Sequence, residues 1–275
     1  MKRISAIIIS ICLFISMNIS ASPSDEMILG STTPTTVTET VHHITKTLKQ
    51  QKFKVLAVID HQSNAANVGL TLRPTQLVLF RHPRSERYLT RQSRTVAIDL
   101  PFKILVYEDA KGAIKVKTNN IGYILDRHEI PLHPPRLQRL NESLDQLGGN
   151  ENGLVFVKSQ QPIDDTVSKL RSVLEAAGFF IAFELEMANG KHHSSGTLLI
   201  FGNPNVGTQL MQNSQETGLD LPQKYLVYKD QNDQVLIVYN DPRFIAKRAG
   251  IQGLDLLLTN ISSALAKFAN LGAIP

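Results

Sequence analysis

Apolar positions recur along the chain at two periods, and the same order of elements occurs twice. Two stretches have apolar residues every three or four positions, which predicts an amphipathic helix at the start of each half. Alternating stretches follow and predict strands. Each half then predicts a second strand, a second helix, a hairpin, a short helix and an amphipathic closing helix. The apolar positions are Val37, Val41, Ile44, Leu48 and Ile163, Val167, Leu170, Leu174 for the opening helices; Val55, Ala57, Ile59 and Ile181, Phe183, Leu185 for one face of each first strand; and Leu137, Leu140, Leu144, Leu147 and Leu254, Leu257, Ile261, Leu265, Phe268 for the closing helices.

The second half of the sequence repeats the first. Residues 77–130 align with residues 198–251 at a constant offset of 121, with 17 identities in 54 positions. Upstream, residues 40–60 align with residues 166–186 at an offset of 126. The stretch 147–153 has the glycine-rich composition of a linker. We therefore predict an α+β protein with helices packed on antiparallel sheets, in two tandem domains at 25–147 and 153–275 joined by a linker at 148–152.

The N-terminus has the three-part layout of a secretory signal peptide. It begins Met1-Lys2-Arg3, continues with an apolar core at 4–15 and turns small and polar at 16–22. We expect a signal peptide at 1–21, a periplasmic or secreted mature protein, and no transmembrane span after cleavage, because the apolar core is short. Cys12 is the only cysteine and would leave with the signal peptide. Disulfides and thiol catalysis are therefore not expected.

Composition and charge narrow the class of partner. The chain has 275 residues, of which 42% are hydrophobic and 19% charged, which is an ordinary globular mixture. The formal net charge is +5, and loss of Lys2 and Arg3 leaves 27 basic residues against 24 acidic ones. So weak a charge, in a protein expected to be exported, argues against nucleic acid as a partner.

Several short motifs resemble a bacterial family, the domain of unknown function 302. The first copy contributes residues 59–61, 69 and 72–80, and the second contributes 201–204, 207–208, 211, 220–222 and 239–242. The resemblance implies two tandem compact α+β domains, often dimeric, and no established activity or catalytic residues. The chain would then be a possible homo-oligomer or an internal pseudo-dimer.

These motifs also have a structural interpretation. Asn203 followed by Pro204 fits a helix N-cap with proline at the first helical position, and Asp241 repeats that pattern. Asp99 and Asp220 each precede Leu-Pro, and we expect them to accept backbone hydrogen bonds between a helix and a strand. Neither copy keeps the whole motif set, so two identical catalytic sites are not expected. Either one composite site survives or the chain is a fused pseudo-dimer used for binding.

Asp60 and His61 are the one local pair that resembles acid–base machinery. A carboxylate can orient an imidazole for proton transfer, although adjacent strand residues point to opposite faces unless the strand ends there. We hold two interpretations open, a ligand or acid–base pair and a polar pair at a strand end. Two histidine pairs, His42-His43 and His192-His193, lack a third ligand at diagnostic spacing, so no metal and no cofactor is predicted.

Arginine recurs in the first copy at spacings of three and four. The spacing predicts that Arg84, Arg87, Arg91 and Arg94 share one side of the second helix, with Arg73 nearby in sequence. The corresponding residues of the second copy are neutral, so the fold does not require arginine there. We interpret the set as a candidate anion-binding surface, with a solvated basic face as the alternative. The candidates for an acidic partner are a lipid head group, a glycan or a protein.

The sequence therefore favours an exported, non-enzymatic binding or interaction protein for an unknown small ligand or an acidic partner. The alternative is an enzyme or metal-dependent protein that uses Asp60 and His61.

Overall fold

The computed structural model describes residues 24–26, 36–131, 152–188 and 194–275. The expected signal peptide, the linker up to residue 151, the first closing helix with Leu137, Leu140, Leu144 and Leu147, and the His192-His193 pair lie outside the described residues.

The first copy contains a five-stranded antiparallel sheet in the order β1-β5-β4-β3-β2. Strand β1, which precedes the opening helix, was not predicted from the sequence pattern. The elements are β1 (Ser24–Glu26), α2 (Val37–Gln50), β2 (Lys54–Asp60), α3 (His61–Ala66), β3 (Thr75–Arg81), α4 (Pro83–Gln92), the 3-10 segment η1 (Arg94–Asp99), β4 (Phe102–Glu108), β5 (Ile114–Asn119) and α5 (Ile121–Arg127).

The second copy repeats this plan with the order β6-β10-β9-β8-β7, which confirms an α+β fold with two tandem domains. Its described residues also contain a long closing helix, and they include no counterpart of α3. The elements are β6 (Leu154–Lys158), α7 (Ile163–Ala176), β7 (Phe180–Ala188), β8 (Ser194–Gly202), α8 (Pro204–Asn213), the 3-10 segment η2 (Gln215–Leu219), β9 (Gln223–Lys229), β10 (Val235–Asn240), α9 (Pro242–Arg248) and α10 (Asp255–Gly272).

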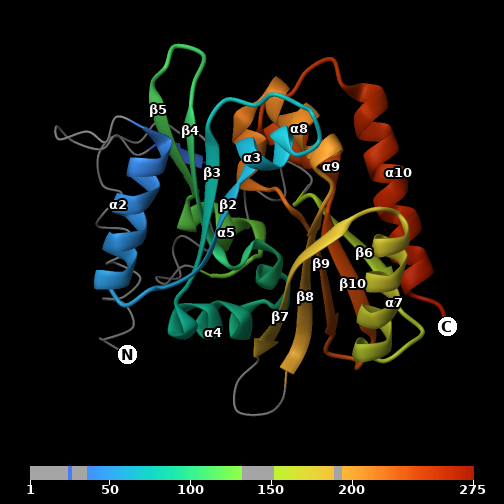
Figure 1. Ribbon diagram of the computed structural model, residues 1–275. Coiled ribbons are helices and arrows are strands. Elements are labelled where there is room, and N and C mark those ends of the chain that lie inside the picture. Colours follow the sequence, from blue (N-terminus) through green and yellow to red (C-terminus); the bar gives the residue numbers. More distant parts are fainter. Residues whose placement is uncertain (1–23, 27–35, 132–151, 189–193) are drawn as a thin grey trace, which may run out of the picture.

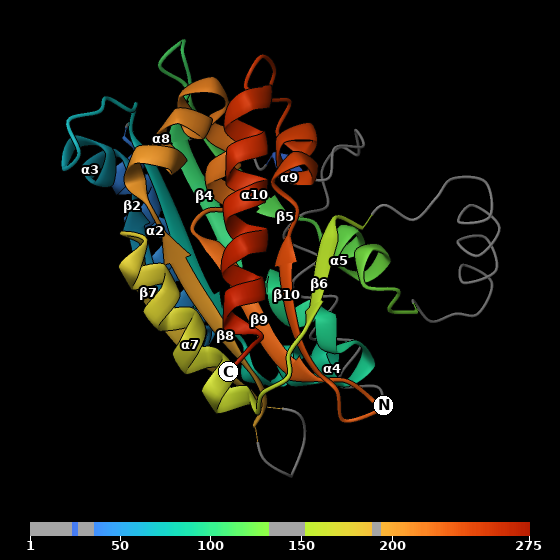
Figure 2. The same cartoon turned by 90° about the vertical axis from the view of Figure 1, so that its right-hand side faces the viewer.

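Helices cover the outer face of each sheet, and the two sheets face each other through the middle of the molecule. Helix α2 lies on the outside of the first sheet, at the opposite side of the molecule from α7 and α10 (Figure 1). Viewed from the second copy, α10 runs across the sheet formed by β8, β9 and β10 (Figure 2). The apolar stripes of the opening helices are buried as their spacing predicts: Val41 and Leu170, for example, belong to the two outer cores.

In the middle layer, each copy contributes a short segment that packs on the sheet of the other copy. The segment η1 of the first copy packs on β9 and β10 of the second, and η2 of the second packs on β3, β4 and β5 of the first. The central core accordingly mixes the copies, with Ile98 from η1 beside Leu226 from β9, and Leu219 from η2 beside Leu105 from β4. Each segment runs into a cis Leu-Pro peptide, at Pro101 and at Pro222. The two copies thus form an internal pseudo-dimer.

One prediction about the first strands is wrong. Val55 packs in the outer core below α2, whereas Ile59 packs in the inner core. In the second copy Ile181 is likewise outside and Phe183 inside. A β-bulge lies between Val55 and Ala57 and again between Ile181 and Phe183. An extra residue in one strand shifts the alternation by one, so the apolar residues on its two sides face opposite directions.

Candidate functional site

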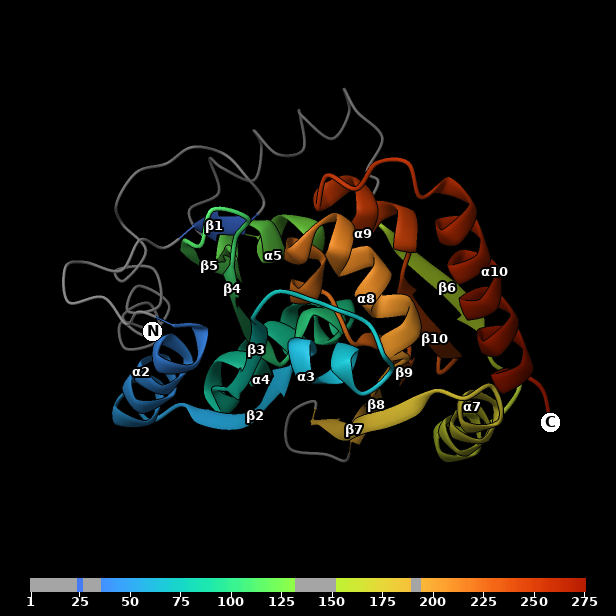
Figure 3. The ribbon, with the colours of Figure 1, turned by 45° about the horizontal axis from the view of Figure 1, so that its top comes forward.

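A pocket of about 270 Å³ lies where α3 of the first copy meets the second copy. Its walls come from the corner between β8 and α8, the start of β9 and one side of α10, and α3 completes it. Helix α3 lies beside α8 (Figure 3). Apolar contacts hold it and the loop that follows it there, with Ala65 and Leu72 in one cluster with Leu210 and Met211 of α8. Gln212 of α8 also donates to the Thr71 carbonyl at 2.7 Å. The pocket is therefore composite.

Family-like motif residues build the corner of the pocket. Asn203 is the N-cap of α8, where its side chain accepts from the Asn205 amide at 3.0 Å, and Pro204 begins the helix. Gly202 and Gly207 both line the pocket. A Cβ on Gly202 would meet the Phe180 ring at 3.2 Å, and one on Gly207 would meet Leu221 at 3.5 Å. Small residues here leave the corner open.

The corresponding corner of the first copy is filled. At the offset of 121, Arg81 and Glu86 stand where the second copy has Gly202 and Gly207, and they form an ion pair at 2.7 Å. Phe102 stands in place of Gln223 and stacks on Phe80 at 5.7 Å between ring centroids. The repeat therefore carries the open corner in its second copy alone.

His61 is the polar group that the first copy supplies to the pocket. It is 4% exposed, and its Nε2 makes no hydrogen bond. Burial lowers the pKa of His61 to about 4, against the smaller opposing effects of a hydrogen bond with the Gly218 backbone and of the Asp60 charge. The imidazole is therefore neutral at physiological pH. A second buried atom among the lining residues, Gln223 Oε1, also has no hydrogen-bond partner.

The structure gives Asp60 a different role from its neighbour. Its side chain caps α3, accepting from the Ser63 amide at 2.8 Å, and also accepts from Gln76 Nε2 at 3.1 Å. Helix α3 begins directly at the end of β2, so the imidazole of His61 turns to the pocket while the carboxylate serves the helix end. The two side chains therefore lie in different environments: Asp60 accepts from Ser63 and Gln76, and His61 lines the pocket.

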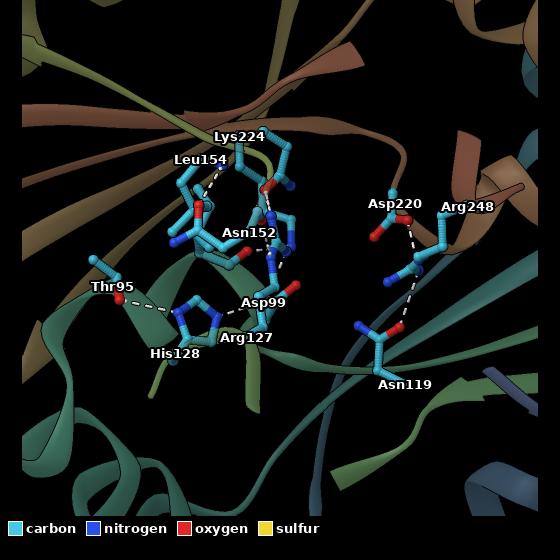
Figure 4. A network of polar contacts seen from close by, with 12 residues as sticks. Thr95, Asp99, Asn119, Arg127, His128, Asn152, Leu154, Asp220, Lys224 and Arg248 are labelled. Atoms are coloured by element: carbon cyan, nitrogen blue, oxygen red, sulfur yellow. Dashed lines mark hydrogen bonds and ion pairs between the residues drawn. The ribbon is translucent and has the colours of Figure 1, made fainter. Parts of the chain in front are cut away.

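A second polar cluster is buried at the centre of the pseudo-dimer (Figure 4). Asp99 binds Arg127 at 2.8 Å and His128 at 2.7 Å, and Asp220 binds Arg248 at 2.6 Å and Lys103 at 3.1 Å. Burial opposes ionisation of both aspartates, but Arg127 and His128 hold the pKa of Asp99 well below its usual value, and Arg248 and Lys103 lower that of Asp220. Both aspartates are thus anions in the interior.

The cluster contains equivalent residues from the two copies. Arg127 donates across the copies to Asn240 at 2.6 Å, and Arg248 donates across to Asn119 at 3.1 Å. Each arginine also lies over an aromatic ring, Arg127 over Phe244 and Arg248 over Tyr123. Lys224, the counterpart of Lys103, donates to the Ile98 carbonyl at 2.8 Å, and burial together with Lys103 lowers its pKa well below the usual value. Every cross-copy residue here has its equivalent 121 positions away.

The backbone partners expected for Asp99 and Asp220 are therefore replaced by charged side chains, of which Lys103 reaches Asp220 from the other copy. Alignment of the two copies indicates that these positions share a role, because the residues are identical in both. The identical pairs are Lys103 and Lys224, Arg127 and Arg248, and Asn119 and Asn240. Asp241, by contrast, is the N-cap of α9 and accepts from the Arg243 amide at 2.8 Å.

The arginine set divides into two groups. Helix α4 ends at Gln92, so Arg94 lies in η1, where it donates to the carbonyls of Lys229 and Asp230 in the second copy. Arg73 donates to Gln215 Oε1 at 2.9 and 2.7 Å, again across the copies. The prediction of four arginines on one helical side is therefore wrong for Arg94, because Ser93 is extended. Arg84, Arg87 and Arg91 remain exposed on α4.

Among the residues that the structure describes, no three His, Cys, Asp or Glu side chains gather closely enough to hold a metal ion. No helix in the described ranges is long and apolar enough to cross a membrane.

Comparison with known proteins identifies relatives of the chain. The family described as "Domain of unknown function DUF302" matches residues 30–147 and 155–269. A crystal structure of an uncharacterized conserved DUF302 protein from Bacillus stearothermophilus is 19% identical, with a TM-score of 0.40, and the match covers 43% of this chain and 97% of that one.

Two curated relatives carry the name "Fluoride-specific ion channel FluC 1". The protein of Brucella suis biovar 1 (strain 1330) is 31% identical over 96 residues, which is 35% of this chain and 38% of the relative. The protein of Brucella abortus biovar 1 (strain 9-941) is also 31% identical over 96 residues, with 36% of its length covered. The chain therefore spans little more than a third of each relative.

Proposed function

We propose that this chain, which belongs to the DUF302 family and contains two of its domains in tandem, is an exported binding protein that holds a small molecule in the pocket between its copies. The observation that carries the proposal is His61 Nε2, a buried nitrogen without a hydrogen-bond partner in a residue that lines a pocket of about 270 Å³. A buried polar atom without a partner costs stability unless something binds it, and a ligand can.

The composite origin of the pocket supports this function. The second copy supplies an open apolar corner, and the first copy closes it with α3 and its histidine. Fusion of the two copies keeps these halves together in every molecule. The channel activity named for the Brucella relatives belongs to proteins of which this chain matches 38% or less, and we do not extend it to this chain.

Binding is favoured over the enzymatic alternative with Asp60 and His61. General acid–base catalysis by such a pair needs the carboxylate to orient the imidazole. The Asp60 oxygens instead accept from Ser63 and Gln76. A histidine with a pKa of about 4 is also a weak base at neutral pH.

A second surface supports a separate contact. Arg84, Arg87 and Arg91 are exposed on α4, and their counterparts Asn205, Thr208 and Gln212 are neutral. Guanidinium groups at this spacing suit phosphate or carboxylate groups of an acidic partner, such as a lipid head group, a glycan or a protein.

Native mass spectrometry of the protein recovered from a bacterial host, expressed with its own N-terminus, tests the main proposal. We expect a mature mass that lacks residues 1–21 and an additional small-molecule mass that dissociates on activation. The Gly207→Leu variant should lose that additional mass because its side chain extends from a pocket-lining position. Gln209→Leu, on the exposed side of the same helix, should keep it. An additional mass that Gly207→Leu retains would place the ligand elsewhere.

A further inference from the structure

The chemistry of the pocket wall restricts the kind of molecule that it can hold. The described residues that line the pocket include no lysine, arginine, aspartate or glutamate. Most of the wall is apolar, with Phe179 from the turn between α7 and β7, Leu221 from the segment just before β9 and Ile261 from α10. Burial of an ionised group without a partner of opposite charge is strongly unfavourable. A charged ligand therefore has nothing here to neutralise it.

The polar atoms of the wall require a hydrogen-bonding group on the ligand. His61 Nε2 and Gln223 Oε1 are both buried and unpaired. A hydroxyl group donates one hydrogen bond and accepts others, so it pairs with the imidazole in either neutral tautomer. Where Nε2 carries the proton, the hydroxyl accepts from it and can donate its own proton to the amide oxygen of Gln223. A purely apolar ligand would leave both atoms without a partner, at the cost that such atoms carry in an interior.

The volume of the pocket limits the size of the apolar part of the ligand. Pockets for drug-sized ligands have volumes of about 300–1,000 Å³, and this pocket has about 270 Å³. Its aromatic and branched walls favour a compact ring system over a charged or extended chain.

We infer that the pocket takes an uncharged compact molecule with an apolar ring body and a hydroxyl group that hydrogen-bonds to His61. This inference rests on the proposed binding function and names the chemical class of the ligand. The contribution of each copy is then distinct: the second copy binds the ring, and the first copy recognises the hydroxyl.

The test uses three probes with the same ring system, 1-naphthol, naphthalene and 1-naphthoate, titrated into the mature protein at pH 7 by calorimetry. We expect 1-naphthol to bind most tightly. Naphthalene should bind about tenfold more weakly, which is the order of one net hydrogen bond. 1-Naphthoate should bind at least as weakly as naphthalene because its carboxylate has no cation in the wall.

Two variants test whether His61 and Gln223 cause the preference for 1-naphthol over naphthalene. His61→Leu should lose the preference for 1-naphthol over naphthalene while it still binds naphthalene, because the wall becomes apolar. Gln223→Leu provides a second reading if His61→Leu does not fold. Gly207→Leu should bind none of the probes, and Gln209→Leu should bind all three as the wild type does.

The outcomes separate the two levels of the argument. Tight binding of 1-naphthoate that Gly207→Leu abolishes would overturn the ligand class and leave the pocket as a binding site. An unchanged preference for 1-naphthol in folded His61→Leu and Gln223→Leu would also overturn the ligand class. Absence of binding for every probe in the wild type would overturn the ligand class, and if the native mass spectrum also shows no additional small-molecule mass, the proposed function is overturned as well.

Discussion

Burial removes the His61 ring from solvent and leaves the protonated form without hydration. The effect is large because the ring is enclosed between α3 and the second copy, where Gly218 and the pocket wall surround it. The pKa of His61 therefore falls from 6.5 to about 4. At neutral pH, His61 is therefore a neutral hydrogen-bonding group and a weak proton acceptor.

This shift predicts a stability that depends on pH. Between pH 6.5 and about 4 the unfolded chain binds a proton at His61 that the folded chain does not. The contribution of His61 to the free energy of unfolding is fully present above pH 6.5. It decreases by about 3 kcal/mol as the pH falls from 6.5 to about 4. His61→Gln should therefore show a shallower loss of the free energy of unfolding over this range, measured by urea denaturation at several pH values. His42→Gln, an exposed site on α2, should follow the wild type, and parallel curves for wild type and His61→Gln would contradict the assigned pKa.

Helices α4 and α8 occupy equivalent places in the repeat and have diverged in what they present. The start of α8 leaves a pocket, whereas the start of α4 is filled by the Arg81–Glu86 pair and a cluster of phenylalanines. The outer side of α4 carries exposed arginine, and the outer side of α8 is neutral. One helix of the repeat therefore suits a small molecule, and the other suits an anionic surface.

The arginine side of α4 predicts salt-sensitive binding to an anionic surface. At low salt the wild type should bind anionic vesicles or an acidic polysaccharide, and binding should weaken as salt rises, because exposed charges are screened over about 8 Å at physiological ionic strength. The combined variant Arg84→Gln, Arg87→Gln and Arg91→Gln should bind several-fold more weakly in a co-sedimentation assay at low salt.

The control removes the same charge elsewhere on the first copy. Lys46→Gln, Lys49→Gln and Lys54→Gln change three exposed lysines on α2 and β2. Equal loss in the two triple variants would show a response to net charge alone, and equal binding by wild type and the arginine variant would leave α4 as a solvated face.

The elements were predictable because their signals are local. Periods of 3.6 and 2 and the capping pattern at Asn203-Pro204 depend on near neighbours in the sequence, and the internal repeat doubled each signal. The bulges at Val55 and Ile181 were not predictable in this way, because one extra residue inverts the alternation without a distinctive residue type. Arg94 was misplaced for a similar reason, since an extended Ser93 interrupts an otherwise continuous helical spacing.

The pocket and the central cluster depend on contacts between the copies, which a single sequence does not report. His61 was singled out, but its approach to Gly202 and Gly207 follows from the packing of α3 on α8. Lys103 and Arg127 are identical in both copies, which indicates a shared role without saying that the partner lies in the other copy. The offset shows equivalence, whereas pairing across the pseudo-dimer is a property of the fold.

At the scale of the whole molecule, the exchange of η1 and η2 joins two small domains into one core. Ile98 and Leu100 of the first copy pack among Leu198 and Leu226 of the second. The charged cluster lies within the same layer, so neither copy can separate without exposing apolar surface and leaving buried charges unpaired. We therefore expect the two copies to unfold as one cooperative unit.

Asp220→Asn tests this expectation because Asp220 binds Lys103 of the other copy and Arg248 of its own. The substitution leaves two buried cations without their carboxylate, and breaking a buried pair costs about 3–5 kcal/mol. Glu184→Gln, which removes an exposed pair with Arg171 at 39% exposure of both side chains, should cost about 1 kcal/mol or less. Native-state hydrogen exchange should show Asp220→Asn lowering the protection of Leu105 in β4 and Leu226 in β9 by equal amounts, since both strands lie in the shared core. Protection lost at Leu226 alone would mean that the copies unfold separately, and a cost no larger than that of Glu184→Gln would mean that the central cluster does not join them.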